Sequence, residues 1–186
     1  MLIPVLATIV RLMWFLIEYP YLWRYRVKPT QNSDQHSAKL WDLANAFELV
    51  GMVLGLLGLG RIRAAPYVIG PIGLCLLIVG IAIRWVAVYT LGKFFTGMVM
   101  IKTNHQLVRS GLYKYLRHPA YTGTLLAHLG LGLAFSNWYS LFISTVPYFL
   151  VVSYRMRVEE RALASAFGSE YETYCKTSKR LIPGVY

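Results

Sequence analysis

The sequence predicts an all-α membrane protein with five transmembrane helices, organised as a single domain over residues 1–186. Hydrophobic residues make up 56% of the chain and charged residues only 15%, whereas soluble domains carry about 25% charged residues. Several apolar runs reach the roughly 17–25 residues needed to cross a bilayer. Because unpaired backbone polar groups are not tolerated against lipid, we expect each run to be helical.

The first apolar run, about residues 2–19, is interpreted as a retained span rather than a secretory signal. No Lys or Arg precedes Arg11, and no small-x-small cleavage site follows the run. The second run, about 43–59, contains Gly51 and Gly55. This small-xxx-small spacing is weak evidence for close helix packing, and a lipid-exposed helix that carries glycines explains it equally well.

The last three runs cover about 67–90, 119–135 and 138–154. Only Ser136 and Asn137 separate the final two runs, which predicts a tight antiparallel helix hairpin. Tryptophans lie in or near the ends of the runs, as interfacial anchors often do: Trp14, Trp23, Trp41, Trp85 and Trp138.

The distribution of Lys and Arg orients the predicted spans. Fifteen of the 19 basic residues fall between spans one and two, between spans three and four, or after span five, and a five-span chain places these segments on one side. The opposite side receives only Arg61 and Arg63. Basic residues are enriched in cytoplasmic segments, so the sequence predicts a cytoplasmic C-terminus and an N-terminus outside.

The net charge of +11 does not indicate a nucleic-acid partner in this context. In a membrane protein it is typical of cytoplasmic segments near anionic lipid. Cys75 falls in mid-span and Cys175 in a polar tail, so both are expected to be free thiols. The sequence contains no metal-ligand spacing, nucleophile elbow or Walker-type phosphate loop. No metal site is therefore predicted.

The stretch SGLYKYLRHPAYTG, residues 110–123, is a polar island between two apolar runs. Its Ser-Gly pair predicts a turn, and Pro119 suits the first turn of the fourth helix. The backbone N–H groups of His118, Ala120 and Tyr121 would then lie at a helix end that attracts a carboxylate or phosphate. On spacing alone, the alternative that Arg117 and His118 anchor the helix at lipid headgroups is the stronger one.

A second polar stretch, YRMRVEERALASAFGSEYETY, covers residues 154–174. Its apolar residues recur every three or four positions, which predicts a cytoplasmic amphipathic helix continuing from the fifth span. Arg155 and Glu159 share one face of it, either as an ordinary ion pair or as groups that hold an anionic substrate and a cationic cofactor. Glu160 and Arg161 are interpreted as the solvated face.

Three polar residues fall inside predicted spans: Glu48, Arg84 and His128. Ionisable residues there are functional candidates by default. For His128, a neutral ring bonded to a neighbouring helix is the stronger interpretation. Arg84 and Glu48 are expected to snorkel or to pair.

Two motifs together resemble a known family. HQLVRSGLYKYLRHPAYTG begins at residue 105, and Arg155 is followed by EERALASAFGSEYETYCKTSKRLIP, which ends at residue 183. The order and spacing resemble the isoprenylcysteine carboxyl methyltransferases and, more widely, integral-membrane methyltransferases that include the phospholipid methyltransferases. The short chain looks like a compact prokaryotic-type member.

The resemblance implies S-adenosylmethionine as the methyl donor, bound at the cytoplasmic face by residues in about 91–123 and 155–183. It assigns Arg155 to the substrate as the catalytic residue. The family's eukaryotic members have a Gln where this chain has Met98, so this chain departs from the family pattern at that position. By position, the cofactor contacts would be His105, Gln106, Leu107, Val108, Tyr113, His118, Pro119, Ala120, Tyr121 and Glu159.

The resemblance further implies methyl-ester formation on the carboxylate of an isoprenylcysteine or a similar lipophilic carboxylate that enters from the bilayer. One alternative is methylation of a lipid amine such as an ethanolamine headgroup, and another is a non-enzymatic membrane scaffold or transporter. A lipid double-bond reductase would require a nicotinamide cofactor instead.

Overall fold

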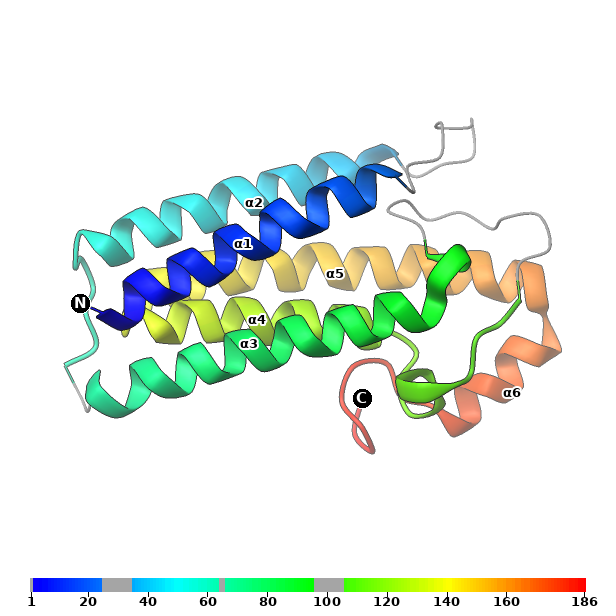
Figure 1. The fold of residues 1–186 in the computed structure, drawn as a ribbon. Coiled ribbons are helices and arrows are strands. Elements are labelled where there is room, and N and C mark those ends of the chain that lie inside the picture. The colour runs from blue at the N-terminus through cyan, green and yellow to red at the C-terminus, as the bar shows by residue number, and fades with distance from the viewer. Residues whose placement is uncertain (1, 25–34, 64–65, 96–105) are drawn as a thin grey trace.

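The computed structural model describes residues 2–24, 35–63, 66–95 and 106–186. Long helices run up and down beside one another (Figure 1), and within the described ranges every regular element is helical, as predicted. Two 3₁₀ turns, η1 (Gly92–Phe94) and η2 (Gly111–Lys114), join them. The helices are α1 (Leu2–Arg24), α2 (Gln35–Leu56), α3 (Pro66–Leu91), α4 (Pro119–Ala134), α5 (Trp138–Phe167) and α6 (Ser169–Thr177).

Among the residues that the structure describes, two stretches are long and apolar enough to cross a bilayer, Leu2–Tyr21 and Tyr67–Phe94. The helix α4 has 16 residues, slightly fewer than the roughly 17–25 that a perpendicular span needs. The count of five transmembrane helices therefore stays a prediction, while the five long helices themselves are confirmed.

The predicted boundaries are accurate where an apolar run and a helix coincide. The fourth run, 119–135, matches α4 to within one residue, and the fifth begins at Trp138 as predicted. The second run starts at 43, yet α2 begins at Gln35. Its first turns are polar, and hydropathy locates only the apolar part of a helix.

The predicted hairpin between α4 and α5 is confirmed. Ser136 adopts a left-handed conformation with φ 47°, which reverses the chain within one residue. The Asn137 side chain caps α5 by accepting a hydrogen bond from the Ser140 backbone N–H at 3.0 Å. The amide of Asn137 also donates to the Leu59 carbonyl at 2.5 Å, which ties the hairpin to the end of α2.

Close helix contacts depend on glycine at two interfaces. A Cβ on Gly55 of α2 would collide with the Ser140 hydroxyl of α5, so the small-xxx-small prediction is confirmed at this position. A closer contact joins α3 to α4, where a Cβ on Gly80 or Gly130 would collide with backbone nitrogen atoms of the facing helix. Small residues let helix backbones approach in this way. The buried Leu77, Ala127 and Leu131 extend that interface.

The predicted continuous amphipathic helix over 154–174 is wrong in one respect, because the helix breaks at Gly168. This glycine has φ 50°, a region that residues with a Cβ rarely adopt, and its N–H caps α5 on the Ala164 carbonyl at 2.9 Å. The chain then turns into α6, which buries Tyr171 and Tyr174. The glycine just after the periodic run is the signal for this stop.

Candidate functional site

The predicted site residues gather at the end of the bundle opposite the N-terminus (Figure 1). There α4 begins, α5 extends beyond the other helices, and α6 with the C-terminal segment folds back beside them. The polar island and the Arg155–Glu159 segment, distant in sequence, therefore meet at one end.

The start of α4 is fixed by the C-terminal segment. His118 occupies the N-cap position, and Pro119 is the first helical residue as predicted. The backbone of 115–118 pairs with the tail: Arg117 N–H donates to the Lys179 carbonyl at 2.7 Å, and Lys179 N–H donates to the Tyr115 carbonyl at 3.0 Å. The helix mouth is thus bordered by residues more than 60 positions away, a contact that local spacing does not reveal.

Two of the three N–H groups expected to attract an anion already have backbone partners. The His118 N–H donates to the Arg180 carbonyl at 3.1 Å, and the Tyr121 N–H donates to the His118 carbonyl at 3.0 Å. The positive end of α4 is therefore partly satisfied, and the side chains of this region are the better candidates for ligand contacts.

The Tyr121 hydroxyl joins the two charges predicted to share a face of α5. It accepts a hydrogen bond from Arg155 Nε at 3.1 Å and donates one to Glu159 Oε2 at 3.2 Å. One phenol thus connects the predicted substrate-binding cation to the predicted cofactor-binding carboxylate. The common face of Arg155 and Glu159 could be read from sequence, whereas the bridging role of Tyr121 could not.

Arg155 is almost fully buried, with 6% of its surface exposed. Its guanidinium carbon lies 5.5 Å from the centre of the Trp41 ring of α2, within the range of a cation–π contact. The sequence predicts Trp41 only as an interfacial anchor, but in the structure it also contacts Arg155 and packs edge-to-face on Tyr148.

The His118 ring lies between two adjacent carboxylates of α5. Its Nε2 is 3.4 Å from Glu160 Oε1, and its Nδ1 is 3.8 Å from Glu159 Oε2. The same ring stacks on Tyr121, with ring centres 5.6 Å apart. His118 is buried and Glu159 has 36% of its side chain exposed, so the carboxylate of Glu159 is the part of this group that an incoming ligand can reach.

The interpretation of Glu160 as part of the solvated face is wrong. Its side chain is only 14% exposed and pairs with Arg117 and Arg180 as well as His118. Burial raises the pKa of Glu160, but the hydrogen bonds and charges of His118 and Arg180 outweigh it, so the pKa falls to about 2. Arg161, by contrast, is exposed as expected.

An apolar cluster lies next to this polar group. Tyr113 and Ala120 are buried together with Ala87 and Val88 of α3, and Val108 packs against them. Burial raises the pKa of the Tyr113 phenol, which keeps it neutral.

The remaining residues predicted to contact the cofactor differ in how far they are exposed. Pro119 is fully buried, Leu107 is half-buried and Gln106 is exposed. His105 and Met98 lie outside the described residues.

The three polar residues inside the predicted spans are all engaged. Arg84 pairs with Glu18 of α1 and donates to Thr124 of α4 at 2.8 Å. Glu48 pairs with Arg11 at 2.6 Å. His128 has one ring nitrogen 2.6 Å from the Thr124 carbonyl and the other 3.5 Å from Glu48. The expected pairing of Arg84 and Glu48 is therefore confirmed, and their partners Glu18 and Arg11 both belong to α1.

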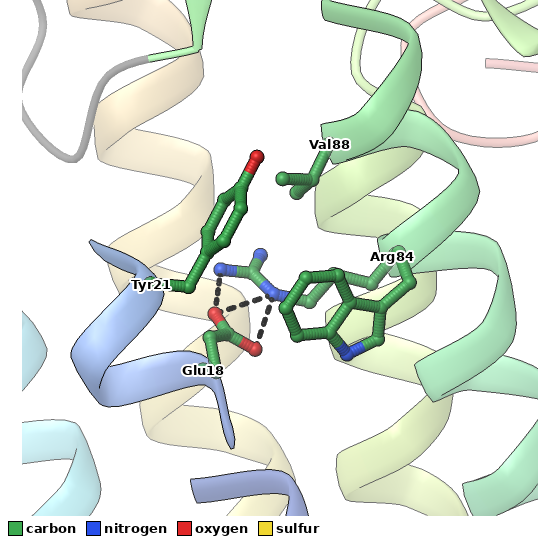
Figure 2. A pocket seen from close by; sticks show the side chains of 5 residues that line it. Glu18, Tyr21, Arg84 and Val88 are labelled. Atoms are coloured by element: carbon green, nitrogen blue, oxygen red, sulfur yellow. Dashed lines mark hydrogen bonds and ion pairs between the residues drawn. The ribbon is translucent and has the colours of Figure 1, made fainter. Parts of the chain in front are cut away.

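A narrow crevice without room for a water molecule lies between α1 and α3, and sequence analysis does not predict it. Figure 2 shows the Glu18–Arg84 ion pair beside it, with Tyr21 and Val88 pointing into the same space. Trp85 completes the lining and packs edge-to-face on Tyr21 at 5.2 Å between ring centres.

The side chains at this end of the bundle can bind polar and charged groups. Among the described residues, no cluster of three or more His, Cys, Asp or Glu side chains could hold a metal ion. A buried guanidinium can hold a carboxylate through paired N–H donors, and a partly exposed carboxylate can bind an ammonium group. Both lie beside an apolar cluster.

Comparison with known families matches residues 72–165, about half of the chain, to the isoprenylcysteine carboxyl methyltransferase (ICMT) family. A probable protein-S-isoprenylcysteine O-methyltransferase from Oryza sativa subsp. indica is 36% identical over 107 residues, which are 56% of this chain and 56% of that protein. A protein-S-isoprenylcysteine O-methyltransferase from Schizosaccharomyces pombe is 36% identical over 112 residues, 59% of this chain and 46% of that protein. The chain spans about half the length of these curated relatives.

A solved structure of the eukaryotic intramembrane Ras methyltransferase ICMT is similar in fold. Its TM-score to this chain is 0.66 at 27% sequence identity, over 82% of this chain and 55% of that chain. The likeness therefore extends beyond the segment matched by the family model, into the N-terminal helices.

Proposed function

The chain belongs to the isoprenylcysteine carboxyl methyltransferase family, and from this premise we propose that it transfers a methyl group from S-adenosylmethionine to a carboxylate on a lipophilic molecule such as an isoprenylcysteine. The product is a methyl ester. The single observation that carries the proposal is the Tyr121 hydroxyl, which bridges the Arg155 guanidinium and the Glu159 carboxylate. This bridge supports the proposal of a site for an anionic acceptor next to a site for a cationic donor.

The chemistry of the residues fits S-adenosylmethionine, which supplies an electrophilic methyl group on a sulfonium when bound. Glu159 is partly exposed and suits the amino group or a ribose hydroxyl. The aromatic faces of Tyr113 and Tyr121 favour a cation by roughly 0.5–2 kcal/mol. The apolar cluster that Tyr113 forms with Val108 and Ala120 offers a surface for the adenine.

Arg155 is the residue proposed to hold the acceptor. Its Nε donates to Tyr121, and its guanidinium lies over Trp41, which restricts the orientation of the remaining N–H donors. Arginine binds a carboxylate with a defined planar geometry. A fixed guanidinium can therefore orient the acceptor oxygen for in-line attack, and orientation of this kind supplies much of the rate in such reactions.

Ester formation requires no general base from the chain. A carboxylate is already ionised at neutral pH because its pKa lies near 4. The burial of Arg155 and His118 indicates that water is largely excluded on this side of the site, which strengthens the electrostatic interactions there. The residues named thus act by binding and orienting the reactants.

The proposed site lies at the cytoplasmic face of a five-span membrane domain. The described parts of the basic segments, namely the start of α2, η2 and the C-terminal segment with α6, lie at the end of the bundle where α4 begins (Figure 1). A lipophilic acceptor would enter from the bilayer, and the polar donor from the cytoplasm. Reactants of opposite polarity can meet only at the interface.

The central test replaces Arg155 by Ala. Transfer of labelled methyl from S-adenosylmethionine to an N-blocked farnesylcysteine should fall by at least about 100-fold, since the acceptor loses a buried charge partner. Binding of S-adenosylmethionine, measured by calorimetry in detergent, should change little. The matched control is Arg157→Ala on the exposed side of the same helix. Equal loss of binding and transfer would contradict the acceptor role of Arg155.

A second experiment separates the function classes. Thermal-shift measurements should show stabilisation by S-adenosylmethionine and none by NADPH. An acceptor panel should favour the prenylated carboxylate over phosphatidylethanolamine. Methylation of the lipid amine would support a phospholipid methyltransferase instead, and the absence of any S-adenosylmethionine binding would contradict the proposal.

A further inference from the structure

The Glu160 carboxylate contacts three side chains from two other segments. Arg180 donates to it through Nη2 at 2.7 Å and through Nε at 3.0 Å. Arg117 Nε lies 3.2 Å from Oε1, and His118 Nε2 lies 3.4 Å from the same oxygen. A surface ion pair contributes little to stability, but a largely buried carboxylate with three partners is a different kind of group.

The partners of Glu160 lie where the C-terminal segment meets the start of α4. Arg117 also donates from Nη1 to the Ser178 carbonyl at 2.5 Å and to the Cys175 carbonyl at 3.2 Å. The backbone N–H of His118 donates to the Arg180 carbonyl. The Glu160 carboxylate therefore joins α5 to the segment 115–118 and to the C-terminal segment. His118 contacts both, through its ring to Glu160 and through its backbone N–H to Arg180.

We propose that Glu160 is a positioning residue for the methyl-donor pocket, acting by fixing the orientation of the His118 ring. The proposal rests on the proposed function, in which Tyr121 and Glu159 contact S-adenosylmethionine. The buried His118 ring stacks on Tyr121 and faces Glu159, so its orientation affects both. The proposal adds a residue on the side of His118 that faces the tail, away from Glu159.

The geometry gives the physical reason. When Oε1 of Glu160 accepts from Nε2–H, the ring turns Nδ1 towards Glu159 and lays its face on Tyr121. A ring without Glu160 could rotate by half a turn about χ2, because the two orientations of an imidazole differ little in shape. In metal sites the partners of a histidine fix its tautomer and ring orientation in this way, and the same reasoning applies to a histidine that supports the residues around an organic ligand.

The test compares Glu160→Gln with Glu170→Gln. Glu170 also pairs with an arginine, Arg109, but it is 57% exposed, so its replacement is a matched control. We expect Glu160→Gln to weaken S-adenosylmethionine binding about 10-fold, because the His118 ring loses the charge-assisted hydrogen bond that orients it. The KM for the acceptor should stay within about two-fold. Unchanged binding by Glu160→Gln would overturn the proposal.

A double-mutant cycle distinguishes positioning from general support of the fold. If Glu160 acts through His118, Glu160→Gln should weaken binding by less than about two-fold in a His118→Ala background. A further 10-fold loss there would show a role independent of His118 and overturn the proposal.

Nitrogen-15 NMR of the histidines in the wild-type protein provides a measurement that needs no Glu160 variant. The His118 ring, assigned by its absence in His118→Ala, should carry a proton on Nε2. A neutral ring with the proton only on Nδ1 would overturn the proposal even if Glu160→Gln failed to fold.

These outcomes are separable from those of the proposed function. A wild-type chain that binds no S-adenosylmethionine would contradict the proposed function. A chain that binds it equally well with and without the Glu160 carboxylate would contradict only the positioning role.

Discussion

Replacing Tyr121 by Phe removes one oxygen atom and tests the link between the two halves of the proposed site. The hydroxyl accepts from Arg155 at 3.1 Å and donates to Glu159 at 3.2 Å. The ring itself would stay, along with its stacking on His118. The substitution therefore alters the relative placement of the two charges and leaves the packing in place.

The expected magnitude follows from these two hydrogen bonds. A hydrogen bond to a charged group contributes about 1.5–3 kcal/mol. Both bonds are long, and Glu159 is 36% exposed, so water replaces part of what is lost. A net cost of about 1–2 kcal/mol in the transition state corresponds to a fall of roughly 5- to 30-fold in kcat/KM.

The assay is labelled-methyl transfer to a prenylated cysteine at several acceptor concentrations, with thermal unfolding measured in parallel. Tyr115→Phe is the matched control, since Tyr115 is 59% exposed and belongs to the same segment. The reasoning is refuted if Tyr121→Phe retains kcat/KM within two-fold of wild type. It is also refuted if Tyr115→Phe loses as much activity.

Two further predictions concern stability. The folded pKa of Glu160 is about 2, below its ordinary value of 4.5, so its stabilising effect is present above about pH 5 and is lost as the pH falls towards 2. After allowance for solvent screening this amounts to about 1–2 kcal/mol, and thermal unfolding between pH 6 and pH 3 should show a smaller decline in Glu160→Gln than in wild type. Gly130→Ala should lower the unfolding temperature by several degrees, because the added Cβ would collide with the backbone of α3 and such overpacking costs about 1–3 kcal/mol. Gly51→Ala is the matched control, since a Cβ there would meet its nearest neighbours at an ordinary 3.5 Å. An equal effect of Gly51→Ala would contradict the assigned contact.

The sequence predicts local features of this fold well because their causes are local. Pro119 begins α4 and the two residues Ser136 and Asn137 turn the hairpin, as their chemistry requires. Arg155 and Glu159 share a face because the helical repeat places residues four apart together. Tyr121 and His118 lie next to these two residues because α4 and α5, joined by a short turn, pack against each other.

The role of Glu160 could not be predicted from the same periodicity. Within α5 it follows the buried Val152 and Met156 at four-residue steps, which places it on the packed face, but a glutamate beyond the apolar run is ordinarily exposed to water. Its partners Arg117 and Arg180 lie 43 and 20 residues away in sequence, and the second is brought near only because α6 reverses at Gly168. A helical repeat describes one helix, whereas the burial of Glu160 results from how three segments meet.

The ion pairs of α1 give the site a defined boundary inside the bundle. Arg11 and Glu18 are seven residues apart on one face of α1, and they pair with Glu48 of α2 and Arg84 of α3. Buried charges without partners are strongly destabilising, so such pairs restrict the register between helices more than they add stability.

Arg84 also donates to Thr124, which lies three residues after Tyr121 and therefore on the same face of α4. The Arg84 layer thus lies one helical turn below the Tyr121 hydroxyl. In this layer the Arg84 guanidinium pairs with the Glu18 carboxylate, which also accepts a hydrogen bond from the Trp14 indole. The two charges therefore neutralise each other. Under the proposed function, an anionic acceptor would then be attracted to Arg155, above that layer, and the two arginines would take different roles although both are buried.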